Sequence, residues 1–452
     1  MKEITCFKAY DVRGRVPQDL DADVAYRIGR AYAALIAPKT VAIGRDVRTS
    51  SDSLFKALTK GLTDSGADVY DIGVCGTELV YFATFHLELD GGIMITASHN
   101  PPEYNGMKMV KRGARPISAD TGLKEIQSIA ERQELEAPKQ HGRVGEVNVN
   151  DDYIEHLLGY VDVARLKPLK IVVNAGNGCA GPYVDLLEKH LPFEFVKLQH
   201  TPDGSFPNGV PNPMIEKNRK TTRDAVIESG ADLGVAWDGD FDRCFLFDEL
   251  GQFIEGYYIV GLLAQSFLER IPHARIVHDP RLTWNTLDVV AAGGGRAELS
   301  KSGHAFMKQV MRDADAVYGG EMSAHHYFKD FSYADSGMIP WLLVAEIMSR
   351  QGARLSELVG DRVRKFPASG EINRRVEDAA ATIKRVETRY SAGADAIDHV
   401  DGVSISFADW RFNLRSSNTE PLLRLNVEAR GDAQMMRSKT DELLALIGGE
   451  PG

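Results

Sequence analysis

The chain has little cysteine, no long apolar run and no excess of positive charge, and each shortage excludes a class of protein. Its four cysteines form no CxxC pair in 452 residues, which excludes a disulfide framework and a cysteine zinc site and favours a reducing compartment. The longest apolar stretches, such as 257–268, are too short and too polar to cross a bilayer. Acidic residues outnumber basic ones by 64 to 53, a net charge of −11, which repels nucleic acid and anionic lipid.

The N-terminal stretch reaches Asp11 and Arg13 before any long apolar run, unlike a secretory signal peptide. Apolar residues make up 43% of the chain and charged residues 26%, a balance typical of globular proteins with several buried cores. We therefore expect a cytoplasmic protein with neither nucleic acid nor a membrane as a partner.

Strand and helix signals alternate along most of the chain, which predicts layered α/β sheets. A length of 452 residues is typical of about three domains, and a polar stretch at 131–149 suggests the first boundary. The last 87 or so residues differ, because strands that alternate like antiparallel ones lie between two helices, which predicts an α+β domain. The expected domains are 1–147, 148–250, 251–365 and 366–452.

The main strand predictions are 41–46, 69–74, 91–96, 170–173, 233–237, 275–278, 316–318, 401–407, 410–414 and 422–428. The main helix predictions are 53–66, 153–161, 257–269, 379–390 and 433–446.

The hexapeptide Thr96 to Pro101 follows a buried strand and ends at two prolines. Ser98 is therefore expected on a loop at the carboxyl end of a strand, where open α/β sheets place their chemistry. His99 is its neighbour and Lys108 follows soon after, a combination that suits a serine accepting and donating a phosphoryl group. The alternative is a polar loop in which Ser98 caps the next helix.

The motif Asp238-Gly-Asp240-Phe-Asp242-Arg243 places three carboxylates after another buried strand, where they can converge on one hard cation. The spacing resembles an EF-hand, but Arg243 stands where that loop needs glycine, and strands flank the motif. A remaining rival is an aspartyl-phosphate phosphatase, in which Asp238 is the nucleophile and Ser98 is incidental.

Two further clusters offer polar groups for a ligand. Gly303-His304 and the stretch Gly320 to His325 supply donors and acceptors suited to sugar hydroxyls, although both could be ordinary loops. The stretch Arg415 to Thr419 supplies donors for a phosphate dianion. Ser417 and Glu420 also fit a helix capping box, but the strand predicted at 422–428 argues against a helix start.

These four motifs, in this order, resemble those of the α-D-phosphohexomutases, the family of phosphomannomutase and phosphoglucomutase enzymes, and the resemblance covers essentially the whole chain. It implies four domains around a central active-site cleft. It also implies that Ser98 carries the phosphoryl group. Mg²⁺ would be bound by Asp238, Asp240, Asp242 and the Ser98 phosphate, with Arg243 contacting that phosphate.

The resemblance further implies that Glu321 and Ser323 hold the 3- and 4-hydroxyls of the sugar. Many relatives have glycine where this chain has Ala324, which leaves open whether His325 or His326 faces the site. The implied substrate-binding residues are Tyr10, Arg13, Arg281, His304, Glu321, Ser323, His325, Arg415, Ser417, Asn418 and Thr419.

The implied reaction interconverts mannose 6-phosphate and mannose 1-phosphate through a hexose 1,6-bisphosphate, which would also serve as activator. His99, Lys108 and His325 are candidates for proton transfer. The alternatives are a bifunctional enzyme that also acts on the glucose 1- and 6-phosphates, a phosphoglucosamine mutase, and a silent sugar-phosphate binding protein. The last is disfavoured because Ser98 and all three aspartates are present. A monomer is expected.

Overall fold

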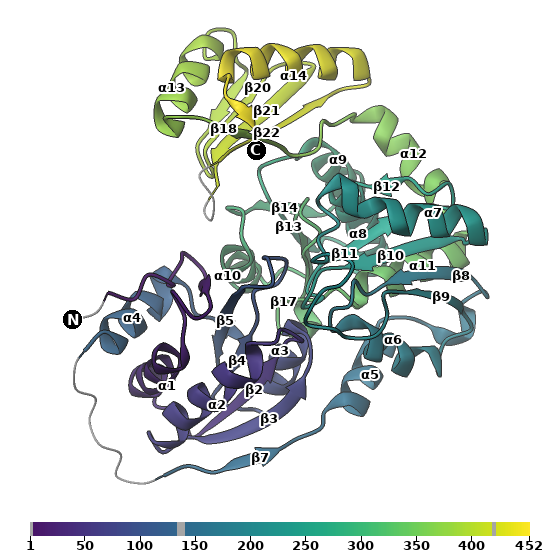
Figure 1. Ribbon diagram of the computed structural model, residues 1–452. Coiled ribbons are helices and arrows are strands. Elements are labelled where there is room, and N and C mark those ends of the chain that lie inside the picture. The colour runs from purple at the N-terminus through teal and green to yellow at the C-terminus, as the bar shows by residue number, and fades with distance from the viewer. Residues whose placement is uncertain (1–2, 133–140, 418–421) are drawn as a thin grey trace. The chain divides into compact units, whose positions relative to one another are not determined.

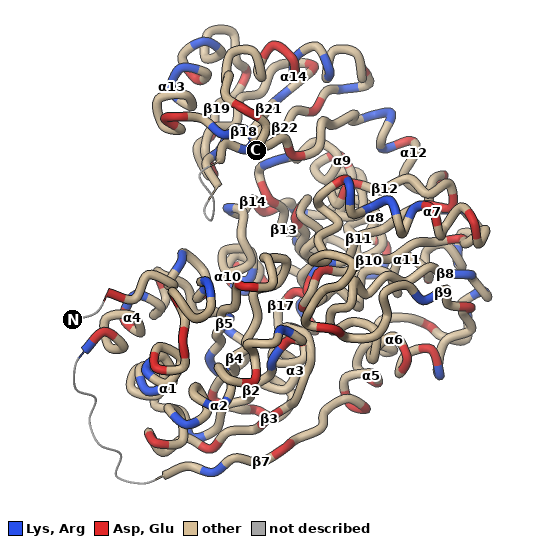
Figure 2. The backbone as a smooth tube through the Cα atoms, viewed as in Figure 1, with Lys and Arg blue, Asp and Glu red and all other residues tan. Residues whose placement is uncertain are grey.

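The computed structural model describes residues 3–132, 141–417 and 422–452 (Figure 1). The chain forms two compact units, of which the first comprises Met1–Phe253 and Asp330–Gly352 and the second Ile254–Lys329 and Ala353–Gly452. All four cysteines are buried and free. Acidic and basic residues are interspersed along the chain (Figure 2). None of the described helices is long and apolar enough to cross a membrane.

The first sheet is mixed, with parallel strands at its centre. Its strand order is β1(Val12–Arg15), β5(Tyr104–Lys111), β4(Gly91–Ile95), β2(Thr40–Arg45), β3(Asp68–Val74) and β7(Val144–Glu146), and β6(Arg115–Pro116) pairs with β5. The helices of this region are α1(Ala22–Ile36), α2(Ser51–Thr63), α3(Thr77–His86) and α4(Lys124–Ala130).

Alternate residues of β2 serve the two faces of this sheet. Val41 and Ile43 join the core formed with α1, α2 and α4. Gly44 points the other way, where a Cβ would lie 2.8 Å from Val80 of α3. The predicted strands at 41–46, 69–74 and 91–96 and the helix at 53–66 are present as β2, β3, β4 and α2.

The second sheet has the order β12(Phe253–Ile254), β11(Cys244–Phe247), β10(Leu233–Trp237), β8(Lys170–Asn174) and β9(Glu194–Leu198). β10 is parallel to β8 and antiparallel to β11, with Trp237 opposite Cys244. The aspartate motif is thus the connection of a hairpin, and the strands on both sides exclude an EF-hand. The helices here are α5(Asn150–Leu158), α6(Ala180–Glu188), α7(Lys220–Ser229) and α11(Ile339–Gln351).

The second unit holds two more sheets. One contains β14(Arg296–Leu299), β13(Arg275–His278), β15(Tyr318–Gly320) and β16(His326–Phe328) in that order, with helices α8(Gly256–Arg270), α9(Trp284–Ala292), α10(His304–Ala314) and α12(Leu355–Lys365). The shorter elements of the chain are η1(Ala119–Leu123), η2(Val163–Arg165), η3(Glu216–Arg219), η4(Lys329–Phe331) and β17(Ala334–Asp335).

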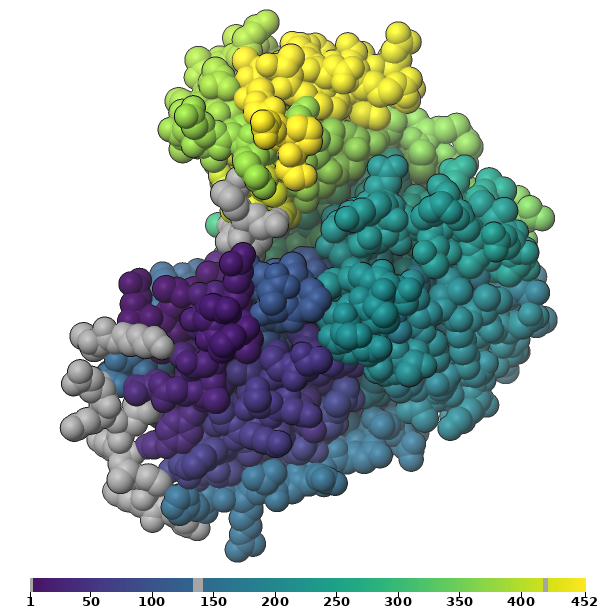
Figure 3. All heavy atoms as spheres, viewed as in Figure 1, coloured from purple at the N-terminus to yellow at the C-terminus, as the bar shows by residue number. Residues whose placement is uncertain are grey.

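The other sheet is antiparallel, as predicted. Its order is β19(Ala396–Asp398), β20(Val403–Ser406), β21(Trp410–Ser416), β22(Leu423–Ala429), β18(Ile372–Arg375) and β23(Glu450–Pro451). Helices α13(Ala379–Tyr390) and α14(Ala433–Ile447) pack on it and share its apolar core. In the space-filling view these C-terminal elements, yellow-green to yellow, form a closely packed surface (Figure 3). The α+β prediction for this region is confirmed.

Candidate active site

Ser98 lies on the loop that follows β4, in a left-handed backbone conformation with φ of 51°. Its Oγ donates a 2.8 Å hydrogen bond to Oδ2 of Asp238 and lies 3.0 Å from Nδ1 of His99. The next element is the strand β5, so the alternative in which Ser98 caps a helix is wrong. The loop instead presents a nearly buried hydroxyl to the aspartate hairpin.

Arg48 holds this serine loop in place, and the sequence analysis missed it. Its guanidinium donates to four backbone carbonyls of the loop, those of Ser98 at 2.9 Å, Asn100 at 2.6 Å, Pro101 at 2.6 Å and Tyr104 at 2.9 Å. Asp46 accepts from its Nε at 3.1 Å. The signal that could have found this pair is its place after β2, because β2 and β4 are parallel and their carboxyl ends share one edge.

The aspartate hairpin gathers three buried carboxylates. One oxygen from each of Asp238, Asp240 and Asp242 lies within 4.8 Å of the other two. Oδ1 of Asp238 and Oδ1 of Asp240 are buried and have no hydrogen-bond partner among the described residues. Buried carboxylate oxygens without donors are costly unless a cation binds them. The three residues therefore fit a hard divalent cation.

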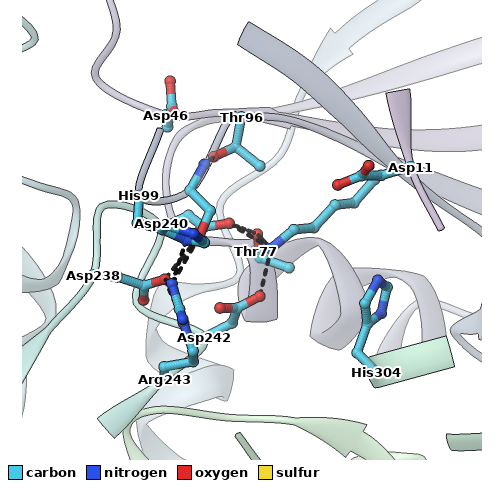
Figure 4. A network of polar contacts seen from close by, with 12 residues as sticks. Asp11, Asp46, Thr77, Thr96, His99, Asp238, Asp240, Asp242, Arg243 and His304 are labelled. Carbon is cyan, nitrogen blue, oxygen red and sulfur yellow. Dashed lines mark hydrogen bonds and ion pairs between the residues drawn. The ribbon is translucent and has the colours of Figure 1, made fainter. Parts of the chain in front are cut away.

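Two contacts bring the hairpin and the serine loop together. A Cβ at Gly239 would lie 2.6 Å from the carbonyl oxygen of Ser98, so only glycine allows this approach. Arg243 donates to Oδ2 of Asp238 from Nε at 2.8 Å and from Nη2 at 2.7 Å, and its Nη2 also contacts His99. Figure 4 shows the side chain of Arg243 pointing toward Asp238 and His99. Burial opposes the charge, but Asp238 and Asp242 raise the pKa of Arg243.

Lys108 reaches the hairpin from β5. Its Nζ donates to Oδ2 of Asp240 at 2.7 Å and to Asp242, and Thr77 at the start of α3 also donates to Asp240. Burial disfavours the ammonium, but the two aspartate charges raise the pKa of Lys108 above its ordinary value. Lys108 is therefore protonated at neutral pH and offsets carboxylate charge. Thr77 is a second residue that the sequence analysis missed.

Arg13 of β1, one of the implied substrate-binding residues, also reaches the serine loop. Its guanidinium contacts Asp11 and donates to Oδ1 of Asn100, in the serine loop, at 2.6 Å. Tyr10 lies just before this strand and is partly buried. The structure thus places Arg13 against the serine loop.

In the second unit, Glu321 is the centre of a buried network. It accepts from Nη2 of Arg281 at 3.2 Å, from the backbone N–H of Gly303 at 2.9 Å and from the hydroxyl of Tyr327 at 2.5 Å. Arg281 also donates to Ser323 at 3.2 Å. The two sugar-loop motifs, predicted separately, are therefore joined by Glu321. His304 begins α10, directly after Gly303.

The two adjacent histidines of this loop have different surroundings. His326 is fully buried in β16, 2.7 Å from the hydroxyl of Tyr318, and burial lowers its pKa to about 3. It is a neutral core residue. His325 is partly buried and stacks on Tyr327, so it is the one that is available to a ligand. Ala324 has a left-handed backbone with φ of 70°, a conformation that glycine adopts with less strain.

Arg415 lies near the end of β21, and Ser417 lies just beyond that strand. The strand predicted at 422–428 is present as β22, whereas Glu420 of the possible capping box falls outside the described residues. Arg415 is buried, and its Nη2 lies 3.4 Å from Glu371. The predicted ligands Asn418 and Thr419 fall outside the described residues. Glu371 was missed because nothing in its local sequence marks it.

Known proteins resemble the chain over its whole length. Models of the phosphoglucomutase/phosphomannomutase family match it as alpha/beta/alpha domains I, II and III over 5–137, 151–251 and 255–366, and as the C-terminal domain over 371–445. A phosphomannomutase of Salmonella montevideo is 60% identical over 454 residues, covering 99% of this chain and 100% of the relative. A phosphomannomutase of Escherichia coli K12 is 58% identical over 454 residues, with the same coverage.

Among solved structures, a phosphoglucomutase/phosphomannomutase family protein from Burkholderia thailandensis is 33% identical. It has a TM-score of 0.88 and covers 100% of this chain and 99% of its own. The chain therefore belongs to the phosphoglucomutase/phosphomannomutase family. It is an isomerase of the phosphotransferring mutase type, built from α/β domains with mixed sheets.

Proposed function

We propose that the chain is a phosphomannomutase that interconverts mannose 6-phosphate and mannose 1-phosphate through phosphorylated Ser98. The observation that carries this is the Ser98 hydroxyl, held 2.8 Å from Asp238 and within reach of Arg243. The identity of close to 60% to curated phosphomannomutases supports mannose as the sugar, and it does not favour the bifunctional alternative. The reaction would take place in the cytoplasm and in a monomer.

In the forward step the phosphoryl group leaves Ser98 for the free sugar hydroxyl. The bond from phosphorus to Ser98 Oγ breaks, a bond from phosphorus to the sugar oxygen forms, and the hydroxyl proton goes to a base. His99, Lys108 and His325 are the candidates for that base. The product of this step is the hexose 1,6-bisphosphate, whose other phosphate then returns to Ser98.

Asp238, Asp240 and Asp242 would hold Mg²⁺, since their buried oxygens fit a hard cation. When bound, the ion would polarise the phosphoryl group and offset the charge that develops on it. Arg243 contributes a fixed positive charge at the same place, and Lys108 orients Asp240 and Asp242. Arg48 fixes the backbone from which Ser98 acts.

Glu321 and Ser323 would bind the 3- and 4-hydroxyls of the sugar, with His304 and Arg281 beside them. The phosphate that is not transferred would be bound by Arg415, Ser417, Asn418 and Thr419. Tyr10 and Arg13 would lie beside the phosphoryl group that is transferred. In this scheme 1–147 is the phosphoserine domain, 148–250 the metal domain, 251–365 the sugar domain and 366–452 the distal phosphate domain.

Mass spectrometry of active enzyme tests the proposal. We expect phosphate on Ser98, and we expect Ser98→Ala to lose nearly all turnover of mannose 1-phosphate. Phosphate trapped on Asp238 would instead support an aspartyl-phosphate phosphatase. Loss of activity in both Ser98→Ala and a Ser118→Ala control would show that the variants are damaged in general.

A further inference from the structure

Glu371 lies directly before β18, at the centre of three arginines in the second unit. Its carboxylate is 3.1 Å from Arg424, 3.4 Å from Arg415 and 3.5 Å from Arg281. The side chains of Glu371 and Arg415 are 6% and 5% exposed, and that of Arg281 is 3% exposed. One buried carboxylate therefore faces two buried guanidiniums and that of Arg424, whose side chain is 20% exposed.

The backbone brings two of these arginines together. Arg415 of β21 and Arg424 of β22 stand opposite each other in the antiparallel register, and like charges in that position repel. Arg281 adds a third charge from the loop after β13. Burial and the charge of Arg281 lower the pKa of Arg415. Burial opposes ionisation of Glu371, but the three arginines lower its pKa, so it is an anion at neutral pH.

Arg415 is only partly satisfied by this arrangement. Among the described residues, the carboxylates paired with it are Glu371 at 3.4 Å and Asp401 at 3.8 Å, longer than a strong guanidinium–carboxylate hydrogen bond of about 2.8 Å. Its Nε is buried and has no hydrogen-bond partner among the described residues. By contrast, Arg281 donates to Asp279 at 2.7 Å. Arg415 thus retains donors for an incoming anion.

We propose that Glu371 is a counter-anion that weakens phosphate binding at Arg281, Arg415 and Arg424. The bound bisphosphate can then leave this subsite and bind again through its other phosphate. This inference rests on the proposed function, in which the distal phosphate binds at Arg415. Each catalytic cycle presents first one and then the other phosphate of the bisphosphate to this subsite. A subsite that binds both orientations too tightly stabilises the intermediate and not the transition state, and therefore slows turnover.

The test uses the full-length protein with Glu371→Gln, which keeps the shape of the side chain and removes its charge. Calorimetry with inorganic phosphate, and with mannose 1-phosphate on the Ser98→Ala background, should show binding about tenfold tighter, because one nearby charge is removed from a poorly screened site. In active enzyme KM and kcat should both fall. Glu371→Asp keeps the charge and should restore affinity and kcat toward the wild-type values.

Thermal unfolding separates this role from a structural brace. Without phosphate the melting temperature of Glu371→Gln should be lower than that of the wild type, because the three arginines lose one carboxylate charge that they share. Added phosphate should raise the melting temperature of Glu371→Gln by more than it raises that of the wild type. If Glu371 only stabilised the fold, Glu371→Gln would also have a lower melting temperature but would bind phosphate more weakly. Unchanged or weaker phosphate binding would therefore overturn the proposal.

Asp401→Asn serves as the second variant, since it removes the more distant carboxylate beside Arg415. Asp401→Asn should tighten phosphate binding by a smaller factor than Glu371→Gln does. If Glu371→Gln does not fold, the phosphate affinity of Asp401→Asn is measured in its place. Binding that is unchanged or weaker in Asp401→Asn would then overturn the proposal. If the wild type does not turn over mannose 1-phosphate, the proposed function fails, whereas the phosphate titrations still decide the role of Glu371.

Discussion

The guanidinium of Arg48 donates a 2.9 Å hydrogen bond to the carbonyl oxygen of Ser98. Because Ser98 has a left-handed backbone, its hydroxyl depends on this support for its direction. We expect Arg48→Lys to lower kcat by about 10²-fold, the scale of a misplacement of about 1 Å at a reacting group. Kinetics measured with mannose 1-phosphate check this.

Arg45→Lys is the matched control for Arg48. Arg45 lies at the end of β2, and its ion pairs among the described residues are with Asp52 and Asp71 and not with the serine loop, so kcat should stay near the wild-type value. Equal losses in the two variants would show that the effect is not specific to the serine loop.

The metal site predicts that chelation abolishes activity without unfolding the protein. Asp240→Asn should cost roughly two decades or more in kcat, as for other lost electrostatic contacts. Far-UV circular dichroism in chelator should match that of the untreated enzyme, and added Mg²⁺ should restore turnover. Full activity in excess chelator would exclude the metal assignment.

The proposed contacts of Glu321 predict which sugar phosphates the enzyme turns over. Mannose and glucose differ at C2, whereas Glu321 and Ser323 are proposed to contact O3 and O4. We therefore expect glucose 1-phosphate to be a substrate at lower or comparable efficiency, and Glu321→Ala to impair both sugars by similar factors. Galactose 1-phosphate, inverted at C4, should be rejected more strongly because it misplaces a hydroxyl that Glu321 and Ser323 are proposed to contact. Assaying the three sugars side by side checks this, and selective loss of mannose turnover would show that this loop distinguishes C2.

Ala324 predicts a gain in stability on substitution by glycine. A left-handed alanine costs roughly 1–2 kcal/mol, and the greater entropy of unfolded glycine offsets about 0.5–1 kcal/mol of that. Ala324→Gly should therefore raise the free energy of unfolding by up to ~1 kcal/mol, measured in urea. Ala37→Gly, which also has a positive φ, should gain similarly. Only Ala324→Gly should raise KM, because the turn that holds Glu321 becomes more flexible.

His156 predicts a fall in stability at mildly acidic pH. It lies among the rings of Phe82, Phe85 and Phe331. Burial lowers its pKa below 6.5, Asp330 opposes this and His86 adds to it. Below pH 6.5 the unfolded chain therefore binds a proton that the folded chain does not, and stability falls as the pH falls. His156→Gln should flatten this dependence in thermal unfolding from pH 7 to pH 5, whereas the exposed His190→Gln should not.

The α/β class, most of the strands and the four motifs could be predicted from the amino-acid sequence. Buried strands such as 233–237 can be recognised from a short stretch of sequence, because each is a short apolar run followed by polar turn residues. Ser98 and the three aspartates were found for the same reason, since each stands at the end of such a strand.

The contacts that hold these groups in place could not be predicted, because they form between residues far apart in the sequence. Lys108 and Asp240 are 132 residues apart, and Arg48 and Ser98 are 50 apart, so no local pattern links them. The role of His326 also depended on the fold, because its burial is the largest cause that lowers its pKa and keeps it neutral. Glu371 is visible as a counter-ion only where β21 and β22 set Arg415 opposite Arg424. Buried charges must be paired, and the partners are chosen by chain packing across long sequence separations.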